Sequence, residues 1–153
     1  MKIFVAGATG AVGLPLVRAL CTQGHQVTGM TSSGSGVDRL RELGAEVSVA
    51  DAFNAAEVRR AVETAEPYVV IDQLTWLPAK PADLIKAMPD DTRLHREGGC
   101  NLLAAAEASG VCRFIIQSRG FYLDAPHGQL ADENAGFVLV LIAILVGSGE
   151  ERL

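Results

Sequence analysis

The sequence has few aromatic residues, no excess of basic charge and no apolar run long enough for an ordinary membrane helix. Aromatic residues make up 5% of the 153 positions, within a hydrophobic fraction of 49% that Ala, Val and Leu dominate. The formal net charge is −5, which argues against general nucleic-acid binding because that function needs a basic surface. The length and composition fit one domain of helices packed on a sheet, large enough to bury a core.

Cysteine is scarce as well. The three cysteines, Cys21, Cys100 and Cys112, form no C-x-x-C pair, and the three histidines show no ligand spacing. This pattern favours a reducing compartment and small buried cysteine side chains over disulfides or a metal site. No basic-then-apolar leader precedes the first apolar run, so we expect a cytoplasmic protein without a secretory signal.

Residues 1–33 contain the most informative pattern. An apolar run, Ile3–Ala6, has the length of a buried parallel strand. Three glycines follow it with the spacing G-x-x-G-x-x-G: Gly7, Gly10 and Gly13. Apolar residues at helical spacing continue to a stop at Gly24, and a second apolar run covers Val27–Met30. The segment therefore predicts a strand, a glycine turn, a helix and a second strand.

This order of elements is the context that a dinucleotide-binding fingerprint requires. The first glycine permits a tight turn, the second lets a pyrophosphate approach the backbone, and the third lets the helix pack on the strand. The helix start adds unpaired N–H groups and a positive dipole end. A tight strand-to-helix connection without a ligand is the alternative, but the complete context favours a dinucleotide. The predicted site residues are Gly7, Thr9, Gly10, Ala11, Val12 and Gly13.

With these glycines, the segment resembles the start of an extended or atypical short-chain dehydrogenase/reductase of the NAD(P)-dependent epimerase/dehydratase group. The similarity continues through Asp51, Gln73-Leu74-Thr75, the run Asn101–Ala106 and Gln117-Ser118, and it fades after Phe121. The resemblance implies an α/β fold with a Rossmann-like doubly wound parallel sheet. Because members of the group continue into a substrate domain, we expect this sheet to be truncated after about five or six strands.

The expected organisation is an NAD(P)-binding domain over residues 1–135, with an apolar segment and tail over residues 136–153 packed on it. Ten consecutive apolar residues, Phe137–Val146, are too few for a membrane helix, which takes about 20 residues. A sixth buried strand or a core helix is expected there. If the run is not buried, it is a dimerisation or aggregation surface.

The resemblance also implies the positions of the ligand. In the group, an acid after the third strand lies beside adenine, which corresponds to Asp51, followed by Ala52. The backbone after the fourth strand lines the nicotinamide ribose, which corresponds to Gln73 and Leu74. An ordinary cap or loop role for Asp51 is equally open.

The second strand leads into Thr31, Ser32 and Ser33, which we assign to the adenosine ribose. An NAD-preferring site usually places an Asp or Glu there, and this chain has none. Small hydroxyl residues accept a ribose phosphate, so the pattern favours NADP slightly over NAD. The nearest arginines, Arg39 and Arg41, lie further along, so the choice stays open. A solvated Gly/Ser loop with no ligand role is the competing interpretation.

Strand and helix patterns alternate through the rest of the chain. Strands are expected at 46–50, 68–71 and 112–116. Helices are expected at 37–43, 54–65 and 94–109. Asn54 and Glu57 resemble a capping box, and the proline-bearing segment 76–89 predicts an irregular loop around a short helical turn. Gly98 and Gly99 inside the last helix indicate either close packing or local looseness.

The catalytic pattern of the group is incomplete. A short-chain dehydrogenase needs a Tyr whose pKa is lowered by a Lys four residues later, and a Ser or Thr hydroxyl beside the substrate. All three lysines lie at or before Lys86, and Tyr122 is followed at the fourth position by Pro126. Ser118 and Tyr122 are therefore the only local candidates for chemistry.

Two functions fit these features, and a third interpretation is that the chain is a remnant that binds nothing. The first function is an NAD(P)-binding oxidoreductase domain with incomplete machinery, acting on a small-molecule or sugar-nucleotide substrate. The second is a non-catalytic dinucleotide-binding or sensing module. We expect no metal, nucleic acid or membrane partner, and a homodimer is a hypothesis that rests on the apolar segment alone.

Overall fold

Five parallel strands form the centre of this computed structural model, which describes residues 1–117. The strands are β1 (Lys2–Ala6), β2 (Gln26–Thr31), β3 (Glu46–Val49), β4 (Val69–Asp72) and β5 (Arg113–Ile116). Their order in the sheet is β3-β2-β1-β4-β5. This order confirms the predicted doubly wound parallel sheet. The predicted domain boundary at residue 135 lies outside the described residues.

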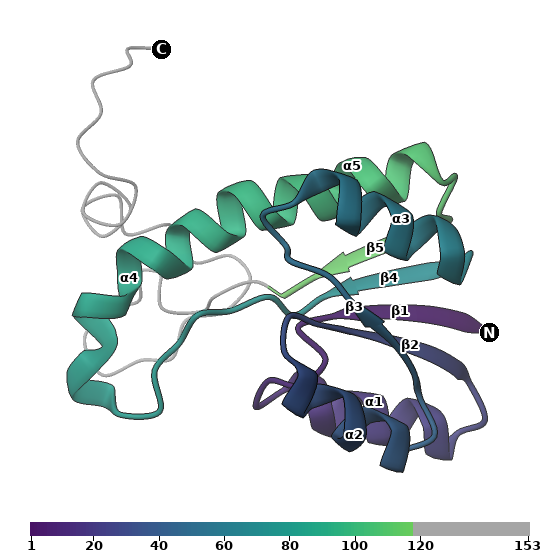
Figure 1. Cartoon of the computed structure of the whole chain (residues 1–153), viewed down its shortest axis with the longest axis horizontal. Coiled ribbons are helices and arrows are strands. Elements are labelled where there is room, and N and C mark those ends of the chain that lie inside the picture. The colour runs from purple at the N-terminus through teal and green to yellow at the C-terminus, as the bar shows by residue number, and fades with distance from the viewer. Residues whose placement is uncertain (118–153) are drawn as a thin grey trace, which may run out of the picture. The chain divides into compact units, whose positions relative to one another are not determined.

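Helices cover both faces of the sheet (Figure 1). Helices α1 (Gly13–Thr22) and α2 (Gly34–Glu42) lie on one face, and α3 (Ala55–Ala65) and α5 (Gly99–Ala108) lie on the other. Successive residues of β1 point to opposite faces, as a strand requires. Ile3 and Val5 pack with Val17 of α1, whereas Phe4 packs with Leu102 of α5. Each face thus has its own apolar core.

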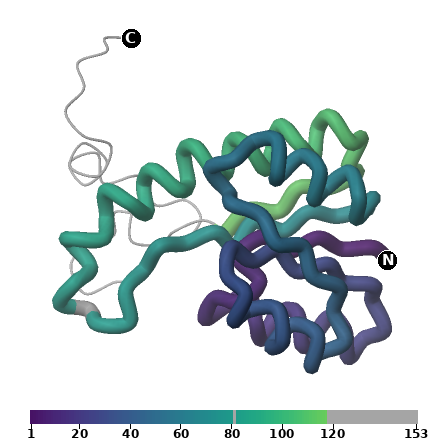
Figure 2. Tube along the Cα trace, in the orientation of Figure 1, coloured from purple at the N-terminus to yellow at the C-terminus, as the bar shows by residue number. Residues whose placement is uncertain are grey.

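The chain changes direction within the sheet at β1. It winds outward from β1 through β2 to β3, and α3 then returns it to the other side of β1, where β4 begins (Figure 2). In such sheets a ligand binds beyond the carboxyl ends of the strands at the point of reversal. The glycine turn after β1 and the loop after β4 meet there.

Helix α2 begins earlier than the sequence predicts. We expected a loop through Gly34–Gly36 and a helix from Val37, but these three residues form the first turn of α2. A Cβ at Gly36 would lie 2.5 Å from Thr31 Oγ1 and 2.7 Å from Thr9 Cγ2. Glycine therefore lets this turn pack against two predicted ligand residues, and the expected helix start at Val37 is wrong.

The predicted loop at 76–89 is only partly correct. A short 3-10 turn, η1 (Pro81–Asp83), leads directly into α4 (Leu84–Arg93), so Pro89 lies inside a helix and does not precede one. A π-helical turn, η2 (Leu94–Gly98), joins α4 to α5, and the three form one long helical segment (Figure 1). Because proline has no N–H, the helix lacks one hydrogen bond at Pro89.

Close packing explains the two glycines at the junction of η2 and α5. A Cβ at Gly98 would lie 3.1 Å from Ala52 Cβ and 3.0 Å from Leu94 Cδ1, and a Cβ at Gly99 would lie 3.4 Å from Asp72 Oδ2. The helix therefore approaches the sheet edge closely. This favours the packing interpretation over local looseness.

The cysteines are less buried than expected. Cys21 is half-buried, while Cys100 and Cys112 are exposed, and all three are free thiols. The α5 positions that face the core are Leu102, Ala105 and Ala106, and Cys100 lies on a different face. None of the helices that the structure describes combines the length and hydropathy needed to cross a membrane.

Candidate functional site

A cavity of about 260 Å³ lies at the carboxyl ends of β1, β2, β3 and β4. Nine of the predicted ligand residues line it: Gly7, Thr9, Gly10, Thr31, Ser32, Asp51, Ala52, Gln73 and Leu74. The other lining residues are Met30, Ala50, Phe53, Thr75, Trp76 and Leu94. The fold therefore brings residues from four separate loops to one place. Ala11, Val12, Gly13 and Ser33 are not among its lining residues.

The three glycines of the turn have different surroundings. Gly7 has φ +71°, and a Cβ there would overlap the carbonyl of Gln73, while a Cβ at Gly13 would overlap the carbonyl of Gly7. A Cβ at Gly10 would meet only the Gly7 carbonyl oxygen, at 3.2 Å. The fold thus requires glycine at the first and third positions. Gly10 lines the cavity, beside the Gly7 carbonyl.

Helix α1 begins directly behind this turn. Its N-cap residue, Val12, makes no side-chain capping hydrogen bond, and the first turn has no acidic residue. In this first turn the Leu14 N–H donates to the Gly10 carbonyl and the Leu16 N–H to the Val12 carbonyl, both at 3.1 Å, and Pro15 has no N–H. The turn therefore offers an anion chiefly the positive end of the helix dipole. Ala11, Val12 and Gly13 contribute through their backbone, because they shape the helix start. A pyrophosphate fits this arrangement.

The end of β2 presents hydroxyl groups and no carboxylate. Thr31 is buried, and its Oγ1 accepts a hydrogen bond from Ser33 N–H at 3.3 Å. The hydroxyls of Ser33 and Ser35 lie 3.3 Å apart, and Ser32 lines the cavity. Thr31 therefore holds the turn into α2 and lines the cavity together with Ser32.

Asp51 is held in place from two sides. Its Oδ1 accepts the Phe53 N–H at 3.0 Å, and its own N–H donates to Glu57 Oε2 at 2.9 Å. Asn54 Oδ1 caps α3 by accepting the N–H groups of Ala56 and Glu57, so the predicted N-cap is correct. In a capping box the Glu57 carboxylate would accept the Asn54 N–H. Here it accepts the Asp51 N–H instead, because the Asn54 N–H already donates to the Asp51 carbonyl. Asp51 therefore has a structural role and lines the cavity as well.

Two buried carboxyls lie behind the loop after β4. Asp72 Oδ1 accepts the Leu74 N–H at 2.9 Å, and Asp91 Oδ1 accepts the Trp76 N–H at 2.6 Å. Burial raises the pKa of the Asp72 carboxyl, and the Leu74 N–H and the nearby His95 oppose this rise. Asp72 and Asp91 are not among the site residues predicted from the sequence. The signal for Asp72 was an acid directly after an apolar strand.

A scan against protein-family models matches residues 7–143 to the family described as NAD(P)H-binding. The chain belongs to this family. It is an NAD(P)-binding domain, and the predicted dinucleotide function is confirmed. The scan does not separate NAD from NADP.

Individual members and neighbours agree with the NAD(P)H-binding assignment. The 3-diazoavenalumate denitrifying reductase of a Streptomyces species is 41% identical over 136 residues, which are 88% of this chain and 43% of that protein. The UDP-glucose 4-epimerase of Thermus thermophilus in complex with NAD superposes with a TM-score of 0.75 and 26% identity, over 90% of this chain and 44% of the epimerase.

A short-chain dehydrogenase/reductase superfamily protein from Agrobacterium tumefaciens with bound NAD gives a TM-score of 0.61 and 28% identity, over 88% of this chain and 38% of that one. These likenesses confirm the resemblance to the epimerase and short-chain dehydrogenase group. The chain spans less than half the length of each of these three proteins.

The two predicted catalytic residues of this NAD(P)-binding domain, Ser118 and Tyr122, lie outside the described residues. Across the sequence, no tyrosine is followed by a lysine at the fourth position. Within residues 1–117, no group of three or more His, Cys, Asp or Glu side chains could hold a metal ion.

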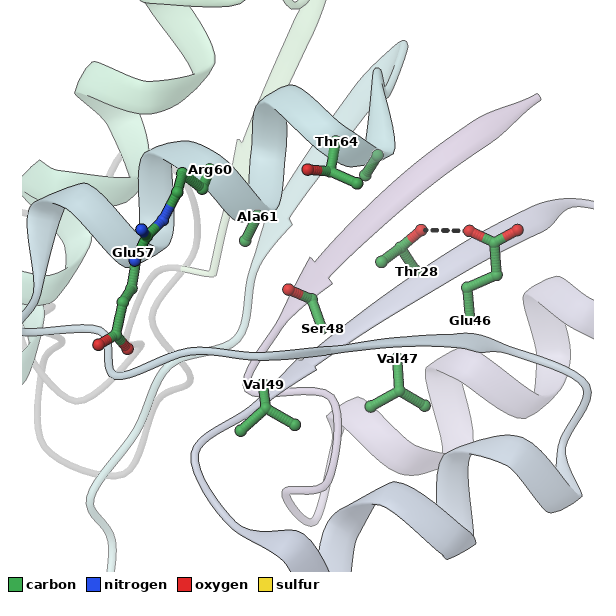
Figure 3. Close-up of a pocket in the computed structure, with 10 residues that line it drawn as sticks. Thr28, Glu46, Val47, Ser48, Val49, Glu57, Arg60, Ala61 and Thr64 are labelled. Carbon is green, nitrogen blue, oxygen red and sulfur yellow. Dashed lines mark hydrogen bonds between the residues drawn. The ribbon is translucent and has the colours of Figure 1, made fainter.

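A second cavity, of about 250 Å³, lies between β3 and α3 (Figure 3). Its charged lining residues are Glu46, Glu57 and Arg60, and Thr28 Oγ1 donates to Glu46 Oε2 at 3.5 Å. Two carboxylates and one guanidinium leave this cavity with a net negative charge. It is therefore less suited to a phosphate-bearing ligand than the cavity beside the glycine turn.

Proposed function

We propose that this chain is the cofactor-binding part of an NAD(P)H-dependent reductase, with the pyrophosphate on the turn Gly7–Gly13. The observation that carries the proposal is the position of Gly10. It lines the cavity at the start of a helix without a side-chain cap, and a Cβ there would meet the Gly7 carbonyl oxygen at 3.2 Å and no other non-neighbouring atom within 4 Å. A phosphate there would accept hydrogen bonds from backbone N–H groups and face the positive end of α1.

The two nucleosides are assigned to opposite sides of this turn. Thr31, Ser32 and Ser33 would contact the adenosine ribose, and Asp51 and Ala52 the adenine. Gln73 and Leu74 would contact the nicotinamide ribose. The support is that β2 and β3 lie on one side of β1 and β4 on the other.

We propose NADP as the preferred cofactor. The end of β2 and the first turn of α2 carry no acidic side chain, so nothing there repels a ribose phosphate. Ser32 supplies a hydroxyl, and the N-terminus of α2 adds a positive dipole end.

The reductase assignment rests on the similarity to the Streptomyces enzyme, whose name describes a reductase. The bound nicotinamide would supply hydride to a small-molecule acceptor. A sugar-nucleotide substrate is the alternative that the epimerase likeness supports. Ser118 and Tyr122 are the proposed catalytic residues of this chain.

A non-catalytic binding or sensing module is the second candidate. The specific observation in its favour is the absence of the Tyr-x-x-x-Lys pair from all 153 residues. Such a module would bind the dinucleotide at the same site and would release it unchanged.

We also propose a cytoplasmic location and a homodimeric state. Three free cysteines and a reduced dinucleotide ligand fit a reducing compartment. The apolar run Phe137–Val146 is the proposed contact between copies.

The deciding experiment is calorimetric titration of the purified chain with NADPH and NADH, beside the variant Gly10→Val. We expect binding that is tighter for NADPH and is lost in Gly10→Val, while that variant keeps its circular dichroism spectrum. Gly34→Ala is the matched control, because a Cβ at Gly34 meets nothing within 4 Å. A folded wild-type chain that binds neither dinucleotide would refute the proposal. Consumption of NADPH with added acceptors then separates a reductase from a sensor.

A further inference from the structure

The loop after β4 forms one wall of the cavity. Its first four residues, Gln73, Leu74, Thr75 and Trp76, all line the cavity, and we call them the β4 wall. A dinucleotide with its pyrophosphate on the turn after β1 extends one nucleoside toward β2 and β3 and the other toward β4. Since the adenosine half is assigned to β2 and β3, the β4 wall lies on the nicotinamide side.

Two carboxyls from different elements hold this wall by its backbone. Asp72, the last residue of β4, accepts the Leu74 N–H, and Asp91, in α4, accepts the Trp76 N–H. Asp72 is 3% exposed and Asp91 is fully buried. Asp91 lies 15 residues after Trp76, so its bond joins the wall to a separate helix.

Carboxyls are an unfavourable choice for a purely structural role in this position. An Asn or Ser side chain would accept the same N–H groups without placing an ionisable group in the interior. Asp72 Oδ2 is buried and has no hydrogen-bond partner within residues 1–117. His95 Nε2 lies 3.8 Å from Asp91 Oδ1, on the next turn of the same helical segment. Strong acceptors are therefore concentrated behind one wall of one cavity.

We propose that Asp72 and Asp91 are positioning residues that hold the β4 wall in the conformation that receives the nicotinamide half of the dinucleotide. The inference rests on the proposed function, because it needs a dinucleotide in this cavity. It adds two residues that touch no ligand and act through the backbone of the wall.

The test compares Asp91→Ala with Asp90→Ala. The first variant releases the Trp76 N–H, while the second removes an exposed acid from the neighbouring position of the same helix. Each protein is titrated with the full dinucleotide and with its adenosine half alone, which is ADP for NADH or 2′-phosphorylated ADP for NADPH. Trp76 is the single tryptophan of the chain, so its fluorescence anisotropy reports directly on the wall.

We expect Asp91→Ala to bind the full dinucleotide about tenfold more weakly, because a buried N–H loses its partner and the wall loses its fixed position. Affinity for the adenosine half should change less than about twofold, which is within the effect of a distant substitution. Trp76 anisotropy should fall. Asp91→Asn should restore both readouts only in part, since its amide oxygen accepts the same hydrogen bond more weakly than a carboxylate does. Asp90→Ala should match the wild type.

Two results would overturn the inference. One is a folded Asp91→Ala variant that binds the dinucleotide as the wild type does. The other is an equal loss of both ligands, which marks a general structural role. If Asp91→Ala does not fold, Asp72→Ala provides the same test at Leu74, and it also removes the unpaired oxygen. A wild-type chain that binds neither ligand refutes the proposed function. If the wild type binds both ligands and the variants bind them with the same affinities, only the inference is refuted.

Discussion

The carbonyl of Gln73 occupies the space that a side chain at Gly7 would take. Gly7 follows the first strand and Gln73 follows the fourth, and the Gln73 N–H donates to the Ala6 carbonyl at 3.1 Å. The glycine turn and the β4 wall are therefore packed directly against each other. A change at the proposed pyrophosphate site reaches the proposed nicotinamide site through this contact.

Gly7→Ala should be strongly destabilising. The residue has φ +71°, and its Cβ would overlap the backbone of Gln73. We expect a loss of at least about 3 kcal/mol in the free energy of unfolding, measured with urea. Gly24→Ala is the control, because Gly24 has φ +79° but open space around it. It should lose only about 1 kcal/mol. Equal losses in the two variants would show that the contact with Gln73 contributes nothing.

Gly36→Ala and Gly34→Ala should have opposite effects, although both lie in the first turn of α2. A Cβ at Gly36 would press on Thr31 and Thr9, and overpacking of this kind costs about 1–3 kcal/mol. A Cβ at Gly34 meets nothing, so the helix propensity of alanine should stabilise that variant by about 0.5–1 kcal/mol. Thermal unfolding followed by circular dichroism measures both. Stabilisation of both variants would contradict the packing described for Gly36.

Asn54→Ala should lower the free energy of unfolding by about 1 kcal/mol, because the first turn of α3 loses its side-chain cap. The same change removes the Asn54 Nδ2 bond to Glu57, whose other oxygen holds the Asp51 N–H. Asn54→Asp keeps the capping oxygen and is the control for the cap alone. Urea titration gives the stability, and an unchanged midpoint in Asn54→Ala would show that the cap is dispensable.

The stability of the protein should depend on pH through Asp72. Burial raises the pKa of this carboxyl in the folded state above its ordinary value of 3.8, so the folded protein holds the proton more tightly than the unfolded chain does. The stability that the protonated Asp72 carboxyl contributes is fully present below its pKa in the unfolded chain. This contribution is lost as pH rises through its higher pKa in the folded protein. Asp72→Asn cannot ionise. The stability of Asp72→Asn relative to wild type should therefore increase as pH rises from below 3.8 across this interval. Urea unfolding at a series of pH values tests this, and the opposite trend would rule out the raised pKa.

The features that the sequence predicts correctly depend on residues that are close together in the sequence. The run Ile3–Ala6 forms a strand because its residues are apolar and the run is short, and Asn54 caps α3 because its side chain reaches N–H groups two and three residues away. Gly110 follows the last helix with φ +65°, the conformation that glycine adopts without strain. Glycine spacing after a strand likewise predicts the turn of the proposed ligand site.

Tertiary structure decided the remaining features. The first turn of α2 forms where a Gly/Ser loop was expected, because Gly36 packs on Thr31 and Thr9. Pro89 stays inside α4 although proline disfavours a helix, and Asp91 is buried although acids favour the surface. The α2 turn depends on a contact with Thr9, and the buried Asp91 depends on the Trp76 N–H. Both partners lie in separate segments, so no local pattern encodes these outcomes. By itself, the sequence determined the order of the elements and the glycine turn, whereas the packing of α4 against the loop after β4 determined the wall of the cavity.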